Sequence, residues 1–268
     1  MIFLKNPARF ILLVLLLTPA LSNGQFFKRF EIAYNYVSVT GNYNGATQVL
    51  DGSGRFAGDS NIKKSVPAVG FGVDIGSTIP LKKIGHTNML GLTIHLVVNE
   101  FVWGSLNQTY GLDGTYTTNA NGNMTGLTEQ IALPIGIDYK LGPDAILTKR
   151  LHVGASFGVG VMPSLNETVM VDPQNLNGGG GLAFGINPYV KAEVAFFAGI
   201  CFKLRGQFAF GNIPFIDQQK SLVSLTDGPF KVTGTTNLML SFIIMPFSMT
   251  WRETGWYNTY DTYNPYER

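Results

Sequence analysis

Residues 151–161 read LHVGASFGVGV. Every second residue from Leu151 to Val161 is apolar, while the residues between them are His, Gly, Ser, Gly and Gly. Successive side chains of a β-strand point to opposite faces, so the stretch predicts a strand with one bulky apolar face and one small or polar face. The solvent face of a soluble β-sandwich would carry many more charged residues. The pattern therefore favours a strand whose apolar face meets lipid.

Seven further runs along the chain have the same two-residue period. Each is about ten residues long, the length that a tilted strand needs to cross a bilayer. Their second face is rich in glycine and poor in charge, which suits the narrow interior of an eight-stranded barrel. The eight runs cover residues 30–36, 69–76, 90–99, 131–139, 151–161, 186–196, 200–210 and 238–244.

The links between the runs alternate in length. Those at 76–89, 140–150 and 197–199 are shorter, and those at 37–68, 99–130, 162–185 and 211–237 are longer and rich in Asn, Gly, Thr and Asp. This layout predicts an all-β, eight-stranded antiparallel up-and-down transmembrane β-barrel with short periplasmic turns and long extracellular loops. Pro134 and Pro188 lie inside expected strands, where each needs a bulge or a strand end. The eighth run loses its alternation near Pro246, which leaves its register open.

The first 24 residues differ from the rest of the chain. Lys5 and Arg9 precede an apolar run at 10–17, and small residues follow it. This order is that of a secretory signal peptide, and the run is far shorter than the roughly 20 residues that span a bilayer. We expect residues 1–24 to be a cleaved signal, residues 25–251 to form an outer-membrane barrel and residues 252–268 to form a periplasmic tail.

The charge balance excludes a nucleic-acid-binding protein. The 268 residues include 19 Lys and Arg against 17 Asp and Glu. Removing Lys5 and Arg9 with the signal leaves 17 basic residues against 17 acidic ones, so the remaining chain is neutral. A nucleic-acid-binding protein would carry a basic surface. The single cysteine, Cys201, also excludes a disulfide framework and a cysteine-built metal site.

Charged residues on the inward faces of the expected strands should gather in the periplasmic half of the lumen. An unpaired charge in such an interior is costly, so we expect these groups to pair and to form a salt-bridged plug. An eight-stranded barrel has room for side chains or one small ligand, not for an aqueous channel. The alternative is that some of the charges point into periplasmic turns and pair with nothing. The residues of this predicted network are Glu31, Asp74, Asp138, His152, Lys191, Glu193, Lys203 and Arg205.

No catalytic or metal-binding set is expected. His152, Ser156 and Asp138 suggest a hydrolase triad, but residues four apart on one strand are separated by about 13 Å, too far for a nucleophile–base hydrogen bond. His95 is expected to form hydrogen bonds in the lumen, and no ligands converge on a metal. The sequence therefore predicts a protein that is not an enzyme and has no cofactor or metal.

Four tyrosines recur at every third position of the tail. A three-residue period fits an extended, polyproline-like strip with one aromatic face. Such a strip predicts docking of a periplasmic or envelope protein. The alternatives are a tail that folds back on the barrel rim or one that is disordered. The four residues are Tyr257, Tyr260, Tyr263 and Tyr266.

Two expected strands carry a family resemblance. Residues 130–141, QIALPIGIDYKL, and residues 151–160, LHVGASFGVG, resemble paired strands of small Gram-negative outer-membrane barrels, of the PorT-like and OmpA/OmpX-like kinds. In those barrels an aliphatic–Pro–aliphatic strand ends in an aromatic–basic pair, and a glycine-rich strand follows. The resemblance implies an outer-membrane location, and its PorT-like side implies a part in protein export by type IX secretion. The Gly-Asn start of the first PorT-like hairpin is absent here.

These observations together favour a non-enzymatic integral outer-membrane barrel in contact with outer-membrane lipid. Its role would be structural, as a scaffold or a component of envelope machinery that presents extracellular loops and a periplasmic tail to partners. The alternatives are a component of protein export, an outer-membrane lipid-modifying enzyme and an exported soluble β-sandwich that binds a ligand. The loops at 40–64 and 104–127 contain no histidine, which disfavours an enzyme.

Overall fold

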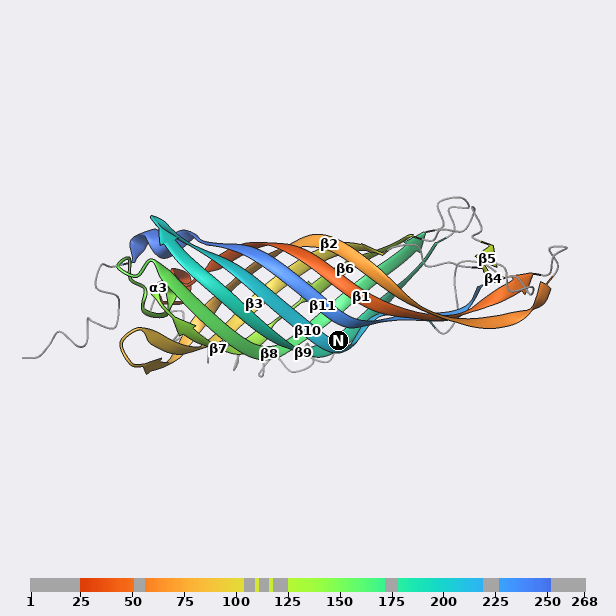
Figure 1. Cartoon of the computed structure of the whole chain (residues 1–268), viewed down its shortest axis with the longest axis horizontal. Coiled ribbons are helices and arrows are strands. Elements are labelled where there is room, and N and C mark those ends of the chain that lie inside the picture. The colour runs from red at the N-terminus through yellow and green to blue at the C-terminus, as the bar shows by residue number, and fades with distance from the viewer. Residues whose placement is uncertain are drawn as a thin grey trace, which may run out of the picture.

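The computed structural model is a barrel of tilted antiparallel strands (Figure 1). It describes residues 25–50, 56–103, 109–110, 116–117, 125–171, 178–218 and 227–251, so the expected signal and the tail tyrosines lie outside the described residues. The strands are β1 (Glu31–Leu50), β2 (Phe56–Ile84), β3 (Asn88–Trp103), β6 (Thr125–Ala132), β7 (Ile135–Leu141), β8 (Val153–Val171), β9 (Gly178–Ala198), β10 (Ile200–Gln218) and β11 (Asp227–Met245), with a small hairpin of β4 (Thr109–Tyr110) and β5 (Tyr116–Thr117).

The sheet closes on itself because the first and last strands pair. β1 runs antiparallel to β11, with Ile32 opposite Ile244. Each remaining strand pairs with its neighbour in chain order, and β6 and β7 together occupy one position between β3 and β8. The predicted eight-stranded antiparallel up-and-down barrel is therefore confirmed.

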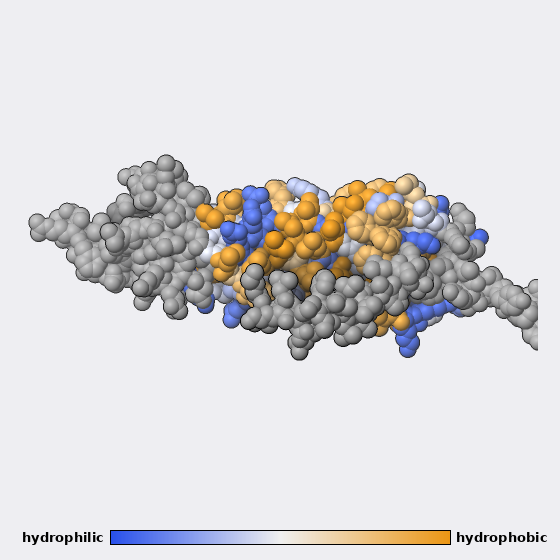
Figure 2. All heavy atoms as spheres, turned by 180° about the vertical axis from the view of Figure 1, so that it is seen from behind, coloured by the Kyte–Doolittle hydropathy of each residue, from blue (hydrophilic) through white to orange (hydrophobic). Residues whose placement is uncertain are grey.

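Outward and inward residues alternate along the strands: the outer wall is apolar, and the inner face carries small and polar side chains together with a buried apolar and aromatic cluster. Phe71 and Phe157 are 54% and 58% exposed on the outside, and apolar residues gather along the wall (Figure 2). On β8 the outward apolar residues run from Val153 to Leu165. At about 3.3 Å per residue and a tilt of about 40°, this length corresponds to a height of roughly 30 Å, which matches the hydrocarbon core of a bilayer. A closed, apolar-walled barrel of this height is built to lie in a membrane.

A row of carboxylates crosses the apolar wall on three neighbouring strands. Glu100, Glu129 and Glu167 are direct cross-strand neighbours on β3, β6 and β8, and all three are exposed. Like charges placed opposite one another on a sheet repel, and only water screens that repulsion well. The row therefore interrupts the apolar wall, and the exposed residues Val102, Leu127 and Val169 follow it toward the loop end.

The two ends of the barrel differ. The end that carries the short links, called the turn end below, holds the helices α2 (Gln25–Lys28), α3 (Pro143–Ile146) and η2 (Pro246–Thr250). The opposite end, called the loop end, holds the ends of β1 and β2 at Leu50 and Phe56 and the paired strands β4 and β5 (Figure 1). None of the described helices is long and apolar enough to cross a membrane.

The strands are longer than the sequence predicts. β1 and β2 pair as far as Leu50 and Phe56, inside the expected loop at 37–68, and β8 and β9 pair as far as Val171 and Gly178, inside the expected loop at 162–185. The expected loop bounds were wrong because the apolar outward face ends before the strands do. On β1, Val37 and Val39 are buried on the inside while Thr40 is exposed on the outside, so the apolar-out pattern is lost although backbone hydrogen bonds continue the ladder.

The prolines sit at breaks in the ladder. Pro134 lies between β6 and β7, and its carbonyl accepts a hydrogen bond from the His95 N–H at 3.0 Å. Pro188 lies one position beyond the last β9–β10 pair, Tyr189 opposite Ala209. There the Asn187 side-chain amide donates to the carbonyls of Phe210 and Asn212 in place of ladder bonds. β11 pairs without a register shift from Thr236 to Met245, and Pro246 begins η2.

Candidate functional site

Seven of the eight predicted lumen residues lie together inside the turn half of the barrel. Each sits on the inward face of its strand and is buried, because the two-residue alternation that turns apolar neighbours toward lipid turns these residues toward the axis. The seven are Glu31 on β1, Asp74 on β2, Asp138 on β7, Lys191 and Glu193 on β9, and Lys203 and Arg205 on β10.

Arg205 is the centre of this ion network. Its Nη2 lies 2.5 Å from Glu31 Oε2, its Nη1 2.6 Å from Asp74 Oδ2 and its Nε 2.6 Å from Glu193 Oε1. One guanidinium thus joins carboxylates from three different strands through three charge-assisted hydrogen bonds. The planar fork of arginine suits this task better than the point charge of lysine.

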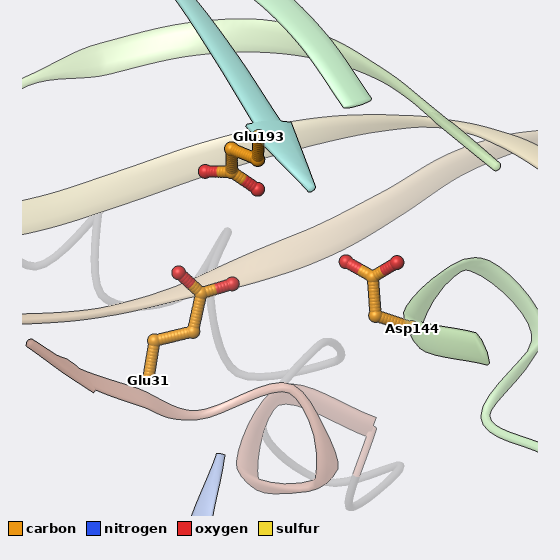
Figure 3. A group of neighbouring side chains, drawn as sticks. All are labelled: Glu31, Asp144 and Glu193. Carbon is orange, nitrogen blue, oxygen red and sulfur yellow. The ribbon is translucent and has the colours of Figure 1, made fainter. Parts of the chain in front are cut away.

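A second centre forms around Lys203, nearer the turn end. Its Nζ lies 2.6 Å from Glu31 Oε1 and 2.7 Å from Asp144 Oδ2, and 3.6 Å from Glu193 Oε2. Lys140 Nζ also lies within 3.7 Å of each of these three carboxylates. Figure 3 shows the three carboxylates converging from β1, α3 and β9. Their oxygens are grouped closely enough to hold a metal ion, but the two ammonium groups of the chain itself supply the positive charge between them.

The remaining members extend the ion network across the lumen. Lys191 Nζ lies 2.9 Å from Asp138 Oδ2, and the Thr93 hydroxyl donates to the other oxygen of Asp138 at 3.1 Å. His95 Nδ1 lies 2.9 Å from Asp74 Oδ1. His95 is therefore a hydrogen-bonding group of the lumen, which is the role the sequence predicts for it.

Two members of the ion network, Lys140 and Asp144, were missed by the sequence analysis. Lys140 could have been found, because it stands two residues after the inward-facing Asp138 and so shares its face. Asp144 carries no such signal. It belongs to the link between β7 and β8, which reads as an exposed turn, and only the fold reveals that this turn enters the barrel mouth.

His152 does not belong to the ion network, in contrast to the prediction. It is exposed, just before the first residue of β8, and its Nδ1 lies 3.4 Å from the Phe197 carbonyl. The alternation places it on the inward face, but the barrel wall has ended at this level, so the ring stays in water. Ser156 donates instead to Glu193 Oε2 at 2.8 Å, so the triad of His152, Ser156 and Asp138 does not form.

Above the ion network, toward the loop end, amide side chains cross the lumen. Asn99 donates to Gln130 at 3.2 Å, Gln130 donates to Asn166 at 2.9 Å, and Asn166 donates to the Pro214 carbonyl at 2.7 Å. Asn237 also donates to Gln130, at 3.3 Å. These side chains are buried and come from β3, β6, β8 and β11. They connect strands on opposite sides of the barrel.

An aromatic cluster follows the amides. The rings of Phe101, Trp103 and Phe215 lie with centroids 5.0–5.8 Å apart in edge-to-face arrangements, which are favourable for aromatic pairs. Each ring is fully buried. Trp103 Nε1 donates to Thr128 Oγ1 at 2.7 Å, so its polar atom is satisfied. Along its described length the lumen thus contains three successive layers, of ions, amides and aromatic rings.

The mouth at the turn end is closed by α3. All four residues of α3 are buried, and Arg29 holds the helix by donating to the carbonyls of Asp144 and Ala145 at 3.1 and 2.8 Å. Gly142, which precedes the helix, has φ 100°, a conformation that other residues rarely adopt. The chain can therefore turn inward at this point and carry Asp144 to Lys203.

The Asp144 carboxyl predicts an acid-sensitive step in stability. Burial raises its pKa, but the ammonium groups of Lys203 and Lys140 lower it more, so the pKa lies below the ordinary value of 3.8. A group with a depressed pKa in the folded state stabilises the fold above its unfolded pKa, and this stabilisation is lost as the pH falls toward the folded pKa. Asp144→Asn should lower the free energy of unfolding at pH 7 by about 2 kcal/mol. The difference from the natural chain should shrink below about pH 4.

Urea unfolding in phospholipid vesicles, followed by tryptophan fluorescence between pH 7 and pH 3, measures this effect. Glu129→Gln, which removes an exposed carboxylate from the outer wall, is the control and should not weaken the barrel at any pH. If the free energies of unfolding of Asp144→Asn and the natural chain differ by the same amount across this pH range, ionisation of Asp144 does not stabilise the fold as predicted.

No family model matches the sequence, and no curated protein matches it. Among solved structures, the outer membrane protein OprG from Pseudomonas aeruginosa is 11% identical, with a TM-score of 0.37 over 80% of this chain and 94% of that one. Neisserial surface protein A is 12% identical, with a TM-score of 0.28 over 81% and 96%.

Ail, the attachment invasion locus protein of Yersinia pestis, was solved in complex with a heparin analogue. It is 8% identical to this chain, with a TM-score of 0.31 over 81% of this chain and 98% of that one. Independently of these comparisons, the closed strand order and the apolar exterior identify the chain as an eight-stranded transmembrane β-barrel.

Proposed function

We propose that this chain is a non-enzymatic integral protein of the outer membrane whose lumen is closed by its own side chains. In this role it is a structural or scaffold component of the cell envelope, which contacts membrane lipid through its wall and presents its ends to partners. The apolar wall supports the membrane location, because a closed β-barrel satisfies its backbone hydrogen bonds without water. An export signal in residues 1–24, as predicted from the sequence, would bring the chain there.

The observation that supports the proposal is the set of buried side chains that contact one another inside the barrel. Ions, amides and aromatic rings from strands on every side meet at the axis, and the layers follow one another from the turn end toward the loop end. An eight-stranded barrel leaves just enough interior space for such side chains. A plugged barrel of this kind offers no path for solutes, so its work would be done at its surfaces.

Conductance in a planar lipid bilayer tests the closed lumen. The purified barrel should leave the current at the baseline of the protein-free membrane across ±100 mV. Each preparation should first be shown to migrate differently on SDS electrophoresis before and after heating, which is how a closed barrel behaves. Steady, large channels from a preparation that passes this control would overturn the plug.

The residues inside the barrel do not support an enzyme. Among the described residues, Ser156 bonds to a carboxylate, His152 lies outside the lumen and His95 is held by Asp74. In the part of the chain that the structure describes, no hydroxyl therefore pairs with a histidine, as the serine–histidine arrangement of a hydrolase would need.

Docking of a periplasmic or envelope protein remains a proposal about the tail. It depends on Tyr257, Tyr260, Tyr263 and Tyr266, which lie outside the described residues. A part in protein export likewise follows only from the PorT-like resemblance of two strands.

A further inference from the structure

A hollow of about 560 Å³ lies on the lipid-facing side of the barrel wall. It spans four neighbouring strands, β9, β10, β11 and β1, in two cross-strand rows. The first row is Ala192, Gly206, Leu240 and Tyr36, and the second is Val194, Leu204, Phe242 and Tyr34. The two smallest residues, Ala192 and Gly206, stand side by side, and the hollow exists because neither fills the wall.

Gly206 differs from the glycines that face the lumen. A Cβ atom at Gly158 would come within 2.2 Å of Asp138, and one at Gly136 within 2.3 Å of the Tyr189 hydroxyl, so these glycines make room for neighbouring side chains. A Cβ at Gly206 would meet only Leu240 Cδ2, at 3.8 Å. No described part of the chain requires glycine at this position for close packing. The space over Gly206 is left open on the outside.

The hollow is lined by apolar and aromatic side chains. Glu193, Arg205 and Ser241 belong to the same stretch of wall, but their side chains are buried on the lumen side. At the β1 edge the Tyr34 and Tyr36 rings pack against Phe71, with centroids 5.9 and 5.7 Å apart. No charged side chain therefore faces the hollow. The packed rings of Tyr34, Tyr36 and Phe71 form its apolar edge on the β1 side.

We propose that this hollow is a binding site for one acyl chain of a membrane phospholipid. The hollow is continuous with the apolar wall that already faces the hydrocarbon, so a hydrocarbon chain can enter it without leaving its own medium. An empty hollow would leave its lining without dispersion contacts on one side. Its volume lies within the roughly 300–1,000 Å³ of small-molecule sites. A second barrel would meet this concave surface with a convex wall, which fits it less well than a flexible chain.

Native mass spectrometry of the detergent-purified barrel, incubated with palmitoyl-oleoyl phosphatidylethanolamine, tests the site. The natural chain should retain one lipid at low lipid concentration. Gly206→Phe and Ala192→Leu each put a side chain into the hollow and should weaken retention by about tenfold, the effect of losing the packing of one or two methylene groups. Val98→Phe adds a ring to the lipid-facing side of β3, away from the hollow, and should retain the lipid as the natural chain does.

The outcomes separate the proposal from its alternatives. Equal retention by all four proteins, or no retention by the natural chain, would overturn the acyl-chain site. A dimer that Gly206→Phe and Ala192→Leu both abolish, with no lipid bound, would show that the hollow receives a second copy and would also overturn it. All four proteins must first show heat-modifiable migration, so a failure of the barrel fold cannot be mistaken for a failure of the site.

Discussion

Arg205→Ala should destabilise the barrel by about 3–5 kcal/mol, because it leaves buried carboxylates without their shared cation. Glu31, Asp74 and Glu193 each give one oxygen to the guanidinium at 2.5–2.6 Å. Lys203 still approaches Glu31 and Glu193, but Asp74 keeps only His95 among the ion pairs of the described residues. Without the guanidinium, these buried carboxylates repel one another, and little water is present to screen the repulsion.

Urea unfolding in phospholipid vesicles gives this free energy, and the temperature at which heat-modifiable migration is lost gives an independent measure. Arg205→Lys retains the charge without the fork and should fall between the natural chain and Arg205→Ala. Arg205→Ala combined with Glu193→Gln should be more stable than Arg205→Ala alone, since one unpaired carboxylate is removed. A loss under about 1 kcal/mol for Arg205→Ala would mean that water or rearranged lysines replace the guanidinium.

Trp103→Ala should cost a similar amount, about 3–5 kcal/mol, for a different reason. The indole is fully buried between Phe101 and Phe215 and is bonded to Thr128. Gly126 and Gly41 leave room for this ring, since a Cβ at either position would come within 3 Å of it. Removing the indole therefore opens a cavity that the rigid strands around it cannot close.

The same unfolding measurement, with Trp103→Phe as the control, separates packing from hydrogen bonding. Phenylalanine keeps an aromatic ring in the cluster and loses the bond to Thr128, so it should cost about 1–2 kcal/mol. An equal loss for Trp103→Phe and Trp103→Ala would show that the hydrogen bond, and not the packed ring, stabilises this layer.

The sequence predicts the barrel well because a lipid-facing wall repeats one simple rule. Alternation alone places Phe71 outside and Asp74 inside, and the same rule applied two residues beyond Asp138 would have found Lys140. The alternation rule applies only to residues whose strand is part of the barrel wall. His152 keeps the inward parity but lies beyond the wall, and Asp144 reaches the lumen from a turn whose path depends on Gly142 and Arg29.

The lengths of the strands were harder to predict for a related reason. The predicted alternation needs apolar residues on the outward face, and on β1 this face becomes polar after Tyr36, while Val37 and Val39 are buried on the inside. In these parts of β1 and β2 the strand persists because it pairs with its neighbour, and the local sequence pattern does not reveal that pairing. The hollow over Gly206 could not be predicted either. In the sequence, Gly206 is only a small residue between Leu204 and Phe208, and the hollow is formed together with residues of β9, β11 and β1.

The ion network joins parts of the chain that are made far apart in time. Lys203 and Glu31 are separated by 172 positions, and Arg205 and Glu31 by 174. In a partly inserted sheet, before β1 meets β11, these groups have no counterions within reach and must keep their hydration shells. Loss of water from the interior and pairing of β1 with β11 should therefore occur together. The interior charges then stabilise only the closed barrel, and they disfavour any partly closed sheet.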